Sequence, residues 1–128
     1  MLRIDVGLLV LRLSAALLMV HGWGKLMKLI DGDTVFADPI GIGPLPSLIL
    51  ATFAEFFCAL AVLVGFKTRW AAIPPLIAML VAAFIHHASD PWRTKELAVA
   101  YAVIFLALVF TGGGQYSVDA RLGRGKGR

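Results

Sequence analysis

Several side chains that carry charge or exchange protons lie inside or at the ends of long apolar runs in this sequence. They are Arg12, His21, Lys25, Glu55, His86 and His87. A charge near the centre of a bilayer costs at least ~2.5–3.5 kcal/mol on insertion scales, so such a residue normally faces the interior of a helix bundle and finds a partner there. The chemistry open to these groups is ion pairing, proton transfer and ligand contact.

Arg12 and Glu55 are expected to form an ion pair across the first two apolar runs. Each lies about eight residues, or ~12 Å, inside its run, counted from opposite sides of the membrane. In a core ~30 Å thick the two residues therefore fall within several ångströms of the same depth. Arginine suits this role because it stays charged and offers a planar fork to a carboxylate. The preferred interpretation is a pair that fixes helix register, and the alternative is that Glu55 carries protons or contacts a ligand.

A second group of side chains is expected toward the outer ends of the helices. His21 and Lys25 are four residues apart and share one helix face, and His86 ends the third run on the same side. Together with Glu55 they form the candidate ligand pocket, which would hold a headgroup or a quinone. The alternative is that the histidines only mark the membrane interface.

A metal site built from His21, His86 and His87 is disfavoured by the spacing of these residues. Imidazole suits zinc, copper and iron. Adjacent helical residues, however, point about 100° apart, and the sequence has no His-x-x-x-His pair.

Four apolar runs carry these groups and predict an all-α fold, an integral membrane four-helix antiparallel bundle. The expected spans are about 6–27, 47–66, 70–87 and 93–111, within a membrane domain of residues 1–112. Of all residues, 59% are hydrophobic and 16% are charged. In an average soluble domain roughly 45–50% of residues are apolar and about 25% are charged, so the composition favours a membrane protein.

The connections between the runs are unequal. The segment from Lys28 to Pro46 is the longest and is rich in aspartate and proline, so we expect a solvated lid over the helix ends. Residues 113–128 are expected to form a basic, flexible cytoplasmic tail, because glycine alternates with basic residues from Arg121 onward.

Basic residues predict the orientation and the surface partner. Lysine and arginine are more numerous on the side that holds both termini and the turn at 65–69, which favours cytoplasmic termini. The net charge is +4, and it sits at run ends and in the tail, so anionic lipid headgroups are the expected partner. No basic face interleaved with aromatic residues suggests nucleic acid, so no nucleic-acid partner is expected.

Two motifs follow one another at the spacing of a known membrane family. Leu-Arg-Leu at 11–13 precedes His-Gly-Trp-Gly-Lys-Leu at 21–26, and Ala-Glu at 54–55 precedes Gly-Phe-Lys-Thr-Arg at 65–69. This pattern resembles the first-helix and second-helix signatures of the DoxX family, and the resemblance covers about residues 6–110.

The resemblance implies a multi-pass protein of the prokaryotic cytoplasmic (inner) membrane. It further implies an accessory subunit of a quinone-linked redox system, with quinone as the candidate cofactor and a redox partner protein. It brings forward Thr68 and Arg69, where the threonine would cap the third helix and the arginine would anchor to lipid phosphate.

Other functions remain open from the residues alone. The sequence has no catalytic motif and no cysteine cluster for iron–sulfur ligation, so whether the chain is an enzyme stays undecided. One alternative is a binding or transport module for a small molecule or lipid, in which Glu55 and His21 line a cavity. Another is a membrane anchor for a soluble partner, and homo-oligomerisation is open in each case.

Overall fold

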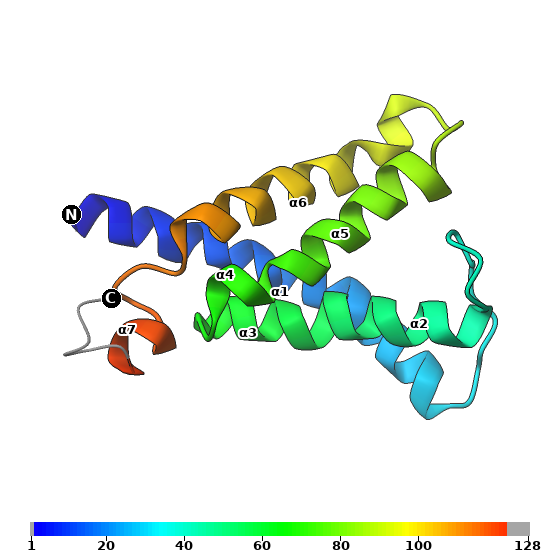
Figure 1. The fold of residues 1–128 in the computed structure, drawn as a ribbon, viewed down its shortest axis with the longest axis horizontal. Coiled ribbons are helices and arrows are strands. Elements are labelled where there is room, and N and C mark those ends of the chain that lie inside the picture. Colours follow the sequence, from blue (N-terminus) through cyan, green and yellow to red (C-terminus); the bar gives the residue numbers. More distant parts are fainter. Residues whose placement is uncertain (1, 123–128) are drawn as a thin grey trace.

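The computed structural model describes residues 2–122, and within them every regular element is a helix. Four helices are long and apolar enough to cross a membrane: Leu2–Ile30, Pro44–Val64, Thr68–His86 and Trp92–Thr111. Successive helices run in opposite directions (Figure 1). The predicted four-helix antiparallel membrane bundle is therefore confirmed.

The first and fourth membrane helices, α1 (Leu2–Ile30) and α6 (Trp92–Thr111), are continuous, and the middle two are divided. The second comprises α2 (Pro44–Thr52), the π-helical η1 (Phe53–Cys58) and α3 (Ala59–Val64). The third comprises α4 (Thr68–Ala71), α5 (Ile73–Val81) and the π-helical η2 (Ala82–His86). The interruption at Ala72 precedes Pro74 and Pro75, which lack the N–H groups that would bond back across it.

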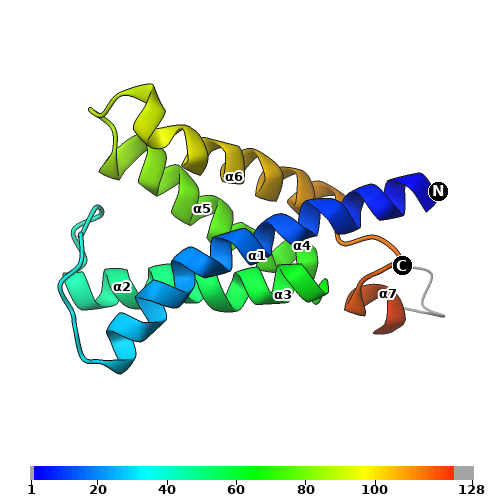
Figure 2. The ribbon, with the colours of Figure 1, turned by 180° about the vertical axis from the view of Figure 1, so that it is seen from behind.

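The helices pack in two pairs. α1 lies along the second membrane helix, and α5 lies along α6. Figure 1 and Figure 2 show the pairs converging near α3 and α4 and diverging toward α2 and η2. The core between them consists of small and large apolar side chains, among them Ala15, Leu18, Ala59, Val62, Ala102, Phe105 and Leu108. Most other apolar side chains face outward, as expected where lipid is the solvent.

Gly22 allows α1 to touch the backbone of η1. A Cβ atom at this position would lie 2.5 Å from the carbonyl oxygen of Glu55, closer than real side chains approach. Small residues permit such close contact between membrane helices. This contact sets the register of the first helix pair, because it fixes Gly22 beside Glu55.

Arg12 does not pair with Glu55, so that prediction is wrong. Its guanidinium is buried and donates hydrogen bonds to main-chain carbonyl oxygens at 2.9–3.1 Å; these acceptors are Val62, Leu63, Gly113 and Tyr116. In the observed register Arg12 lies beside Val62, about seven residues or ~10 Å along the helix from Glu55. Carbonyls in the last turn of a helix carry the negative end of its dipole, which favours a cation there.

The expected flexible tail is also wrong for residues 113–122, which fold back onto the bundle. This segment contains the short helix α7 (Val118–Leu122), and Ser117 and Ala120 are buried. The main-chain N–H of Asp119 donates to the Gly65 carbonyl at 2.9 Å. Residues 123–128, the rest of the predicted tail, lie outside the described residues.

The turn before α4 is capped by a residue that the sequence analysis did not identify. The Asp119 carboxylate accepts hydrogen bonds from the main-chain N–H groups of Lys67 at 2.7 Å and Thr68 at 3.0 Å. Thr68 therefore does not provide the cap, and its buried hydroxyl has no hydrogen-bond partner in the described chain. Arg69 Nε donates to the Val109 carbonyl at 3.0 Å, and its contact with lipid phosphate stays a prediction.

Candidate functional site

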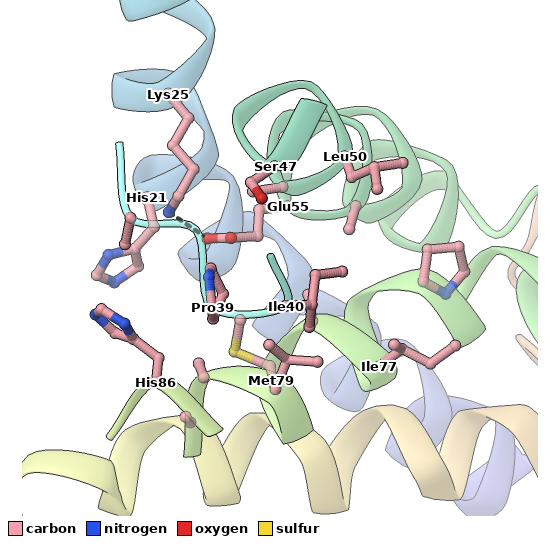
Figure 3. Close-up of a pocket in the computed structure, with 18 of the residues that line it drawn as sticks. His21, Lys25, Pro39, Ile40, Ser47, Leu50, Glu55, Ile77, Met79 and His86 are labelled. Carbon is pink, nitrogen blue, oxygen red and sulfur yellow. Dashed lines mark hydrogen bonds and ion pairs between the residues drawn. The ribbon is translucent and has the colours of Figure 1, made fainter. Parts of the chain in front are cut away.

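A cavity of about 680 Å³ lies where the two helix pairs diverge (Figure 3). It is lined by α1, the second and third membrane helices, α6 and the loop between α1 and α2. Its walls are mainly apolar, and the side chains of Leu50, Phe53 and Ile77 on its rim are about half exposed. Small-molecule sites usually measure about 300–1,000 Å³ and combine apolar walls with a few polar groups, which is the character of this cavity.

Lys25 and Glu55 form an ion pair inside the cavity. The lysine Nζ lies 2.8 Å from Glu55 Oε1, and the two side chains are 23% and 8% exposed. Lys25 comes from α1, about one turn beyond Gly22, and Glu55 comes from η1. The close contact at Gly22 therefore decides that Lys25, and not Arg12, is the partner of Glu55.

His21 and His86 line the same cavity. Their imidazole rings point toward one another from α1 and η2 (Figure 3). The ring of His21 also meets the ring of Tyr101 edge-on, with 6.5 Å between centroids. The structure thus brings together the residues of the candidate ligand pocket, His21, Lys25, Glu55 and His86. That they contact a ligand stays a prediction.

His87 also lines the cavity, and it contacts Asp90, which is not a lining residue. Its Nδ1 lies 2.7 Å from Asp90 Oδ2, and its ring lies 4.4 Å from that of His86, centroid to centroid. Within residues 2–122, no group of three or more histidine, cysteine, aspartate and glutamate side chains could hold a metal ion. The structure therefore offers no geometric support for a metal site at His21, His86 and His87.

The loop of residues 31–43 covers one end of the cavity. Phe36, Pro39 and Ile40 contribute to the lining. Asp38 holds the loop against the start of α2, because its carboxylate accepts hydrogen bonds from Ile42 N, Gly43 N and Ser47 Oγ at 2.7–2.9 Å. The long loop is therefore tied to the start of α2 and forms a wall of the cavity.

The hydrogen bonds of Asp38 also determine its ionisation. Loss of water around the carboxyl raises its pKa, but the bonds from Ser47, Gly43 and Ile42 outweigh this, and the pKa lies below the ordinary 3.8. Asp38 is consequently a carboxylate at neutral pH, the form that accepts these bonds.

Both π-helical segments lie at the cavity, and the sequence analysis did not detect them. η1 carries Glu55 and η2 carries His86, and these side chains line the cavity from different helices. A π-helical turn contains one more residue than an α-helical turn and often occurs at functional sites. No residue type marks such a turn in the sequence, because it results from how neighbouring helices pack.

The fold and the cavity define a class: a small four-helix membrane protein with a ligand-sized cavity bounded on one side by a loop. Comparison with known proteins shows the family. The family model described as DoxX matches residues 7–88. "Inner membrane protein YqjF" of Escherichia coli (strain K12) is 33% identical over 125 residues, which cover 94% of this chain and 95% of that protein. No solved structure shows a significant match. The chain belongs to the DoxX family, as its motifs indicated.

Proposed function

We propose that this protein is an accessory subunit of a quinone-linked redox system in a prokaryotic inner membrane, and that its cavity binds the quinone. The observation that carries the proposal is the cavity itself, which combines apolar walls with a cluster of polar groups at Lys25 and Glu55. The name of the Escherichia coli relative, an inner membrane protein, supports the location.

The lining residues suit a ring that bears oxygen atoms and an apolar tail. The Lys25 ammonium has three N–H donors and uses one toward Glu55, so it can donate to a ring oxygen as well. The imidazoles of His21 and His86 offer further hydrogen bonds from the same side of the cavity. Leu50 and Ile77 on the rim provide an apolar route for a tail into the surrounding lipid.

The proposal assigns electron transfer to a partner protein. The sequence has one cysteine and no recognisable ligand set for haem, flavin or an iron–sulfur cluster. This chain would therefore bind and orient a quinone that exchanges electrons with a redox centre elsewhere in the complex.

We further propose that both termini are cytoplasmic and that the cavity lies near the outer face. The N-terminal end of α1, the α3–α4 turn and α7 lie at the same end of the bundle (Figure 2). This end carries the described basic residues Arg3, Lys67, Arg69 and Arg121, against Lys25, Lys28, Arg93 and Lys95 at the other end. The excess on this side comes from three further basic residues that follow Arg121 in the sequence, namely Arg124, Lys126 and Arg128. An excess of lysine and arginine on one side supports a cytoplasmic position, and these residues would contact anionic headgroups.

The test is an inventory of the molecules that co-purify with the protein in native-lipid nanodiscs. Organic extracts of the parent protein are analysed by mass spectrometry, and we expect quinone in stoichiometric amount. Ala78→Phe should abolish this quinone, because Ala78 lines the cavity and a phenyl ring would fill it. Ala100→Phe is the matched control, since Ala100 is exposed on α6 and does not line the cavity.

The other outcomes discriminate between the alternative functions. Bulk phospholipid alone in all three preparations would contradict the quinone proposal. A specific lipid or small molecule lost only in Ala78→Phe would favour a binding or transport module, which the loop over the cavity also suits. A soluble protein captured equally by all three, with no bound small molecule, would favour a membrane anchor.

A further inference from the structure

We infer that the Lys25–Glu55 ion pair sets the charge selectivity of the cavity, so that it accepts uncharged amphipathic molecules and rejects anionic and cationic ones. The inference deepens the proposed function and rests on it in one respect, namely that the cavity is a ligand site. It does not require that the ligand be a quinone.

Apart from histidines, the cavity lining contains one basic and one acidic side chain. Lys25 and Glu55 provide them, and no arginine or aspartate contributes to the lining in the described chain. The other polar lining side chains are His21, Ser47, His86, His87, Thr94 and Tyr101. Two aspartates outside the lining contact these residues: Asp38 binds Ser47, and Asp90 binds His87. The charges facing a ligand therefore cancel at the 2.8 Å contact between Nζ and Oε1.

A charged head would have to separate this pair or lie beside a like charge. An anion that binds Lys25 either takes it from Glu55, whose side chain is 8% exposed, or lies next to the Glu55 carboxylate and is repelled by it. A cation that recruits Glu55 leaves Lys25 unpaired in the same way. Leaving one member of a buried pair without its partner is strongly unfavourable, so both kinds of charged ligand are penalised.

An uncharged head with oxygen or N–H groups avoids this penalty. Lys25 retains N–H donors beyond the bond to Glu55 Oε1, and the structure gives Glu55 Oε2 no hydrogen bond within the described chain. Such a head can therefore add hydrogen bonds to both residues while the ion pair stays intact.

Stability of the bundle does not by itself account for the pair. A buried ion pair replaced by apolar residues of similar volume often leaves a protein as stable or more stable. Here both residues point into a cavity and not into the packed core, whose members are apolar. A role in ligand selection explains why the pair lies where a ligand would meet it.

The experiment measures binding of three probes that share one alkyl tail and differ in the head: carboxamide, sulfonate or trimethylammonium. Parent protein, Glu55→Gln, Lys25→Met and the double variant are compared in nanodiscs of zwitterionic phospholipid, with empty nanodiscs correcting for partition into lipid. We expect the parent to bind the carboxamide about tenfold more tightly than either charged probe.

Each single variant should change which probe is preferred. Glu55→Gln should gain affinity for the sulfonate by about tenfold, because Lys25 becomes available to an anion, and Lys25→Met should gain similarly for the trimethylammonium probe. The double variant should return to a preference for the carboxamide. Each preference is a ratio within one preparation, so partial misfolding, which lowers all three affinities together, does not imitate it.

Two results would overturn the inference. One is a parent protein that binds the three probes equally or binds none of them, which can be decided even if a variant fails to fold. The other is a pair of single variants that lose all probes in parallel, which would make the ion pair merely structural. A selective parent that carries no quinone would overturn the quinone proposal alone, and bound quinone without the exchange of preference would overturn this inference alone.

Discussion

Main-chain carbonyl oxygens surround the Arg12 guanidinium and take the place of a counter-ion. Val62 and Leu63 contribute two of them from the end of α3, and Gly113 and Tyr116 contribute the others from the segment that follows α6. No carboxylate of the described chain forms an ion pair with it. Five N–H donors in a rigid fork suit such a ring of acceptors, so Arg12 acts as a clamp between two segments.

Replacing Arg12 tests this clamp at the scale of one residue. Arg12→Met should lower the free energy of unfolding by about 2–4 kcal/mol, because each buried acceptor left without a donor costs ~1–3 kcal/mol. Arg12→Lys should fall between, since an ammonium has three donors and no planar fork. Thermal denaturation in detergent measures both.

Arg3→Met is the control for the clamp, because Arg3 is an exposed basic residue on the same helix. If Arg12→Met and Arg3→Met melt at the same temperature, the hydrogen bonds of Arg12 contribute nothing measurable and the clamp is refuted.

At the scale of the element, the contact of α1 with η1 decides which side chains meet. Gly22 has no room for a Cβ beside the main chain of Glu55 and Phe56, whereas Gly24 on the same helix has no atom within 4 Å of that position. The contact places Lys25 within reach of Glu55. Depth counted from the ends of apolar runs is too coarse to detect this, because a shift of one or two turns exchanges one partner for another.

Gly22→Ala tests the contact. The added methyl should force α1 away from η1, cost about 1–3 kcal/mol of stability as overpacking does, and loosen the Lys25–Glu55 pair. Gly24→Ala should be neutral or stabilising, since alanine is the better helix former and meets nothing. Thermal stability of the two variants, measured side by side, decides the matter. Equal behaviour would show that the close approach at Gly22 is unimportant.

At the scale of the whole molecule, the two ends of the bundle differ. One end is closed by the Arg12 clamp and by the Asp119 cap on α4, and the other diverges around the cavity beneath the loop of residues 31–43. Arg12 and Asp119 join segments far apart in the sequence, so the closed end depends on residues after the last membrane helix. The contacts at the closed end join the helices there, and the cavity occupies the other end.

Truncation tests whether the residues after α6 stabilise the closed end of the bundle. Removing residues 113–128 should destabilise the protein by about 2–4 kcal/mol, because Arg12 loses two acceptors and the N–H groups of Lys67 and Thr68 lose their cap. Removing only residues 123–128 keeps every contact among residues 2–122 and should leave the melting temperature nearly unchanged. A flexible tail throughout would instead make the two truncations equivalent.

The sequence by itself determined the membrane fold and the identity of the polar residues. Four apolar runs require membrane helices, because a bilayer satisfies no exposed main-chain polar group. The cost of charge in lipid singled out Arg12, His21, Lys25 and Glu55, and the motifs by themselves indicated the DoxX family.

Only the tertiary structure decided which of these residues are partners. Arg12 donates hydrogen bonds to carbonyl oxygens and Glu55 pairs with Lys25, because the contact at Gly22 fixes the register of the two helices. The Asp119 cap and the two π-helical turns were likewise absent from any local pattern. The physical reason is common to all of them. A local sequence pattern shows that a polar group in the membrane requires a partner, whereas the identity of that partner depends on the packing of segments distant in sequence.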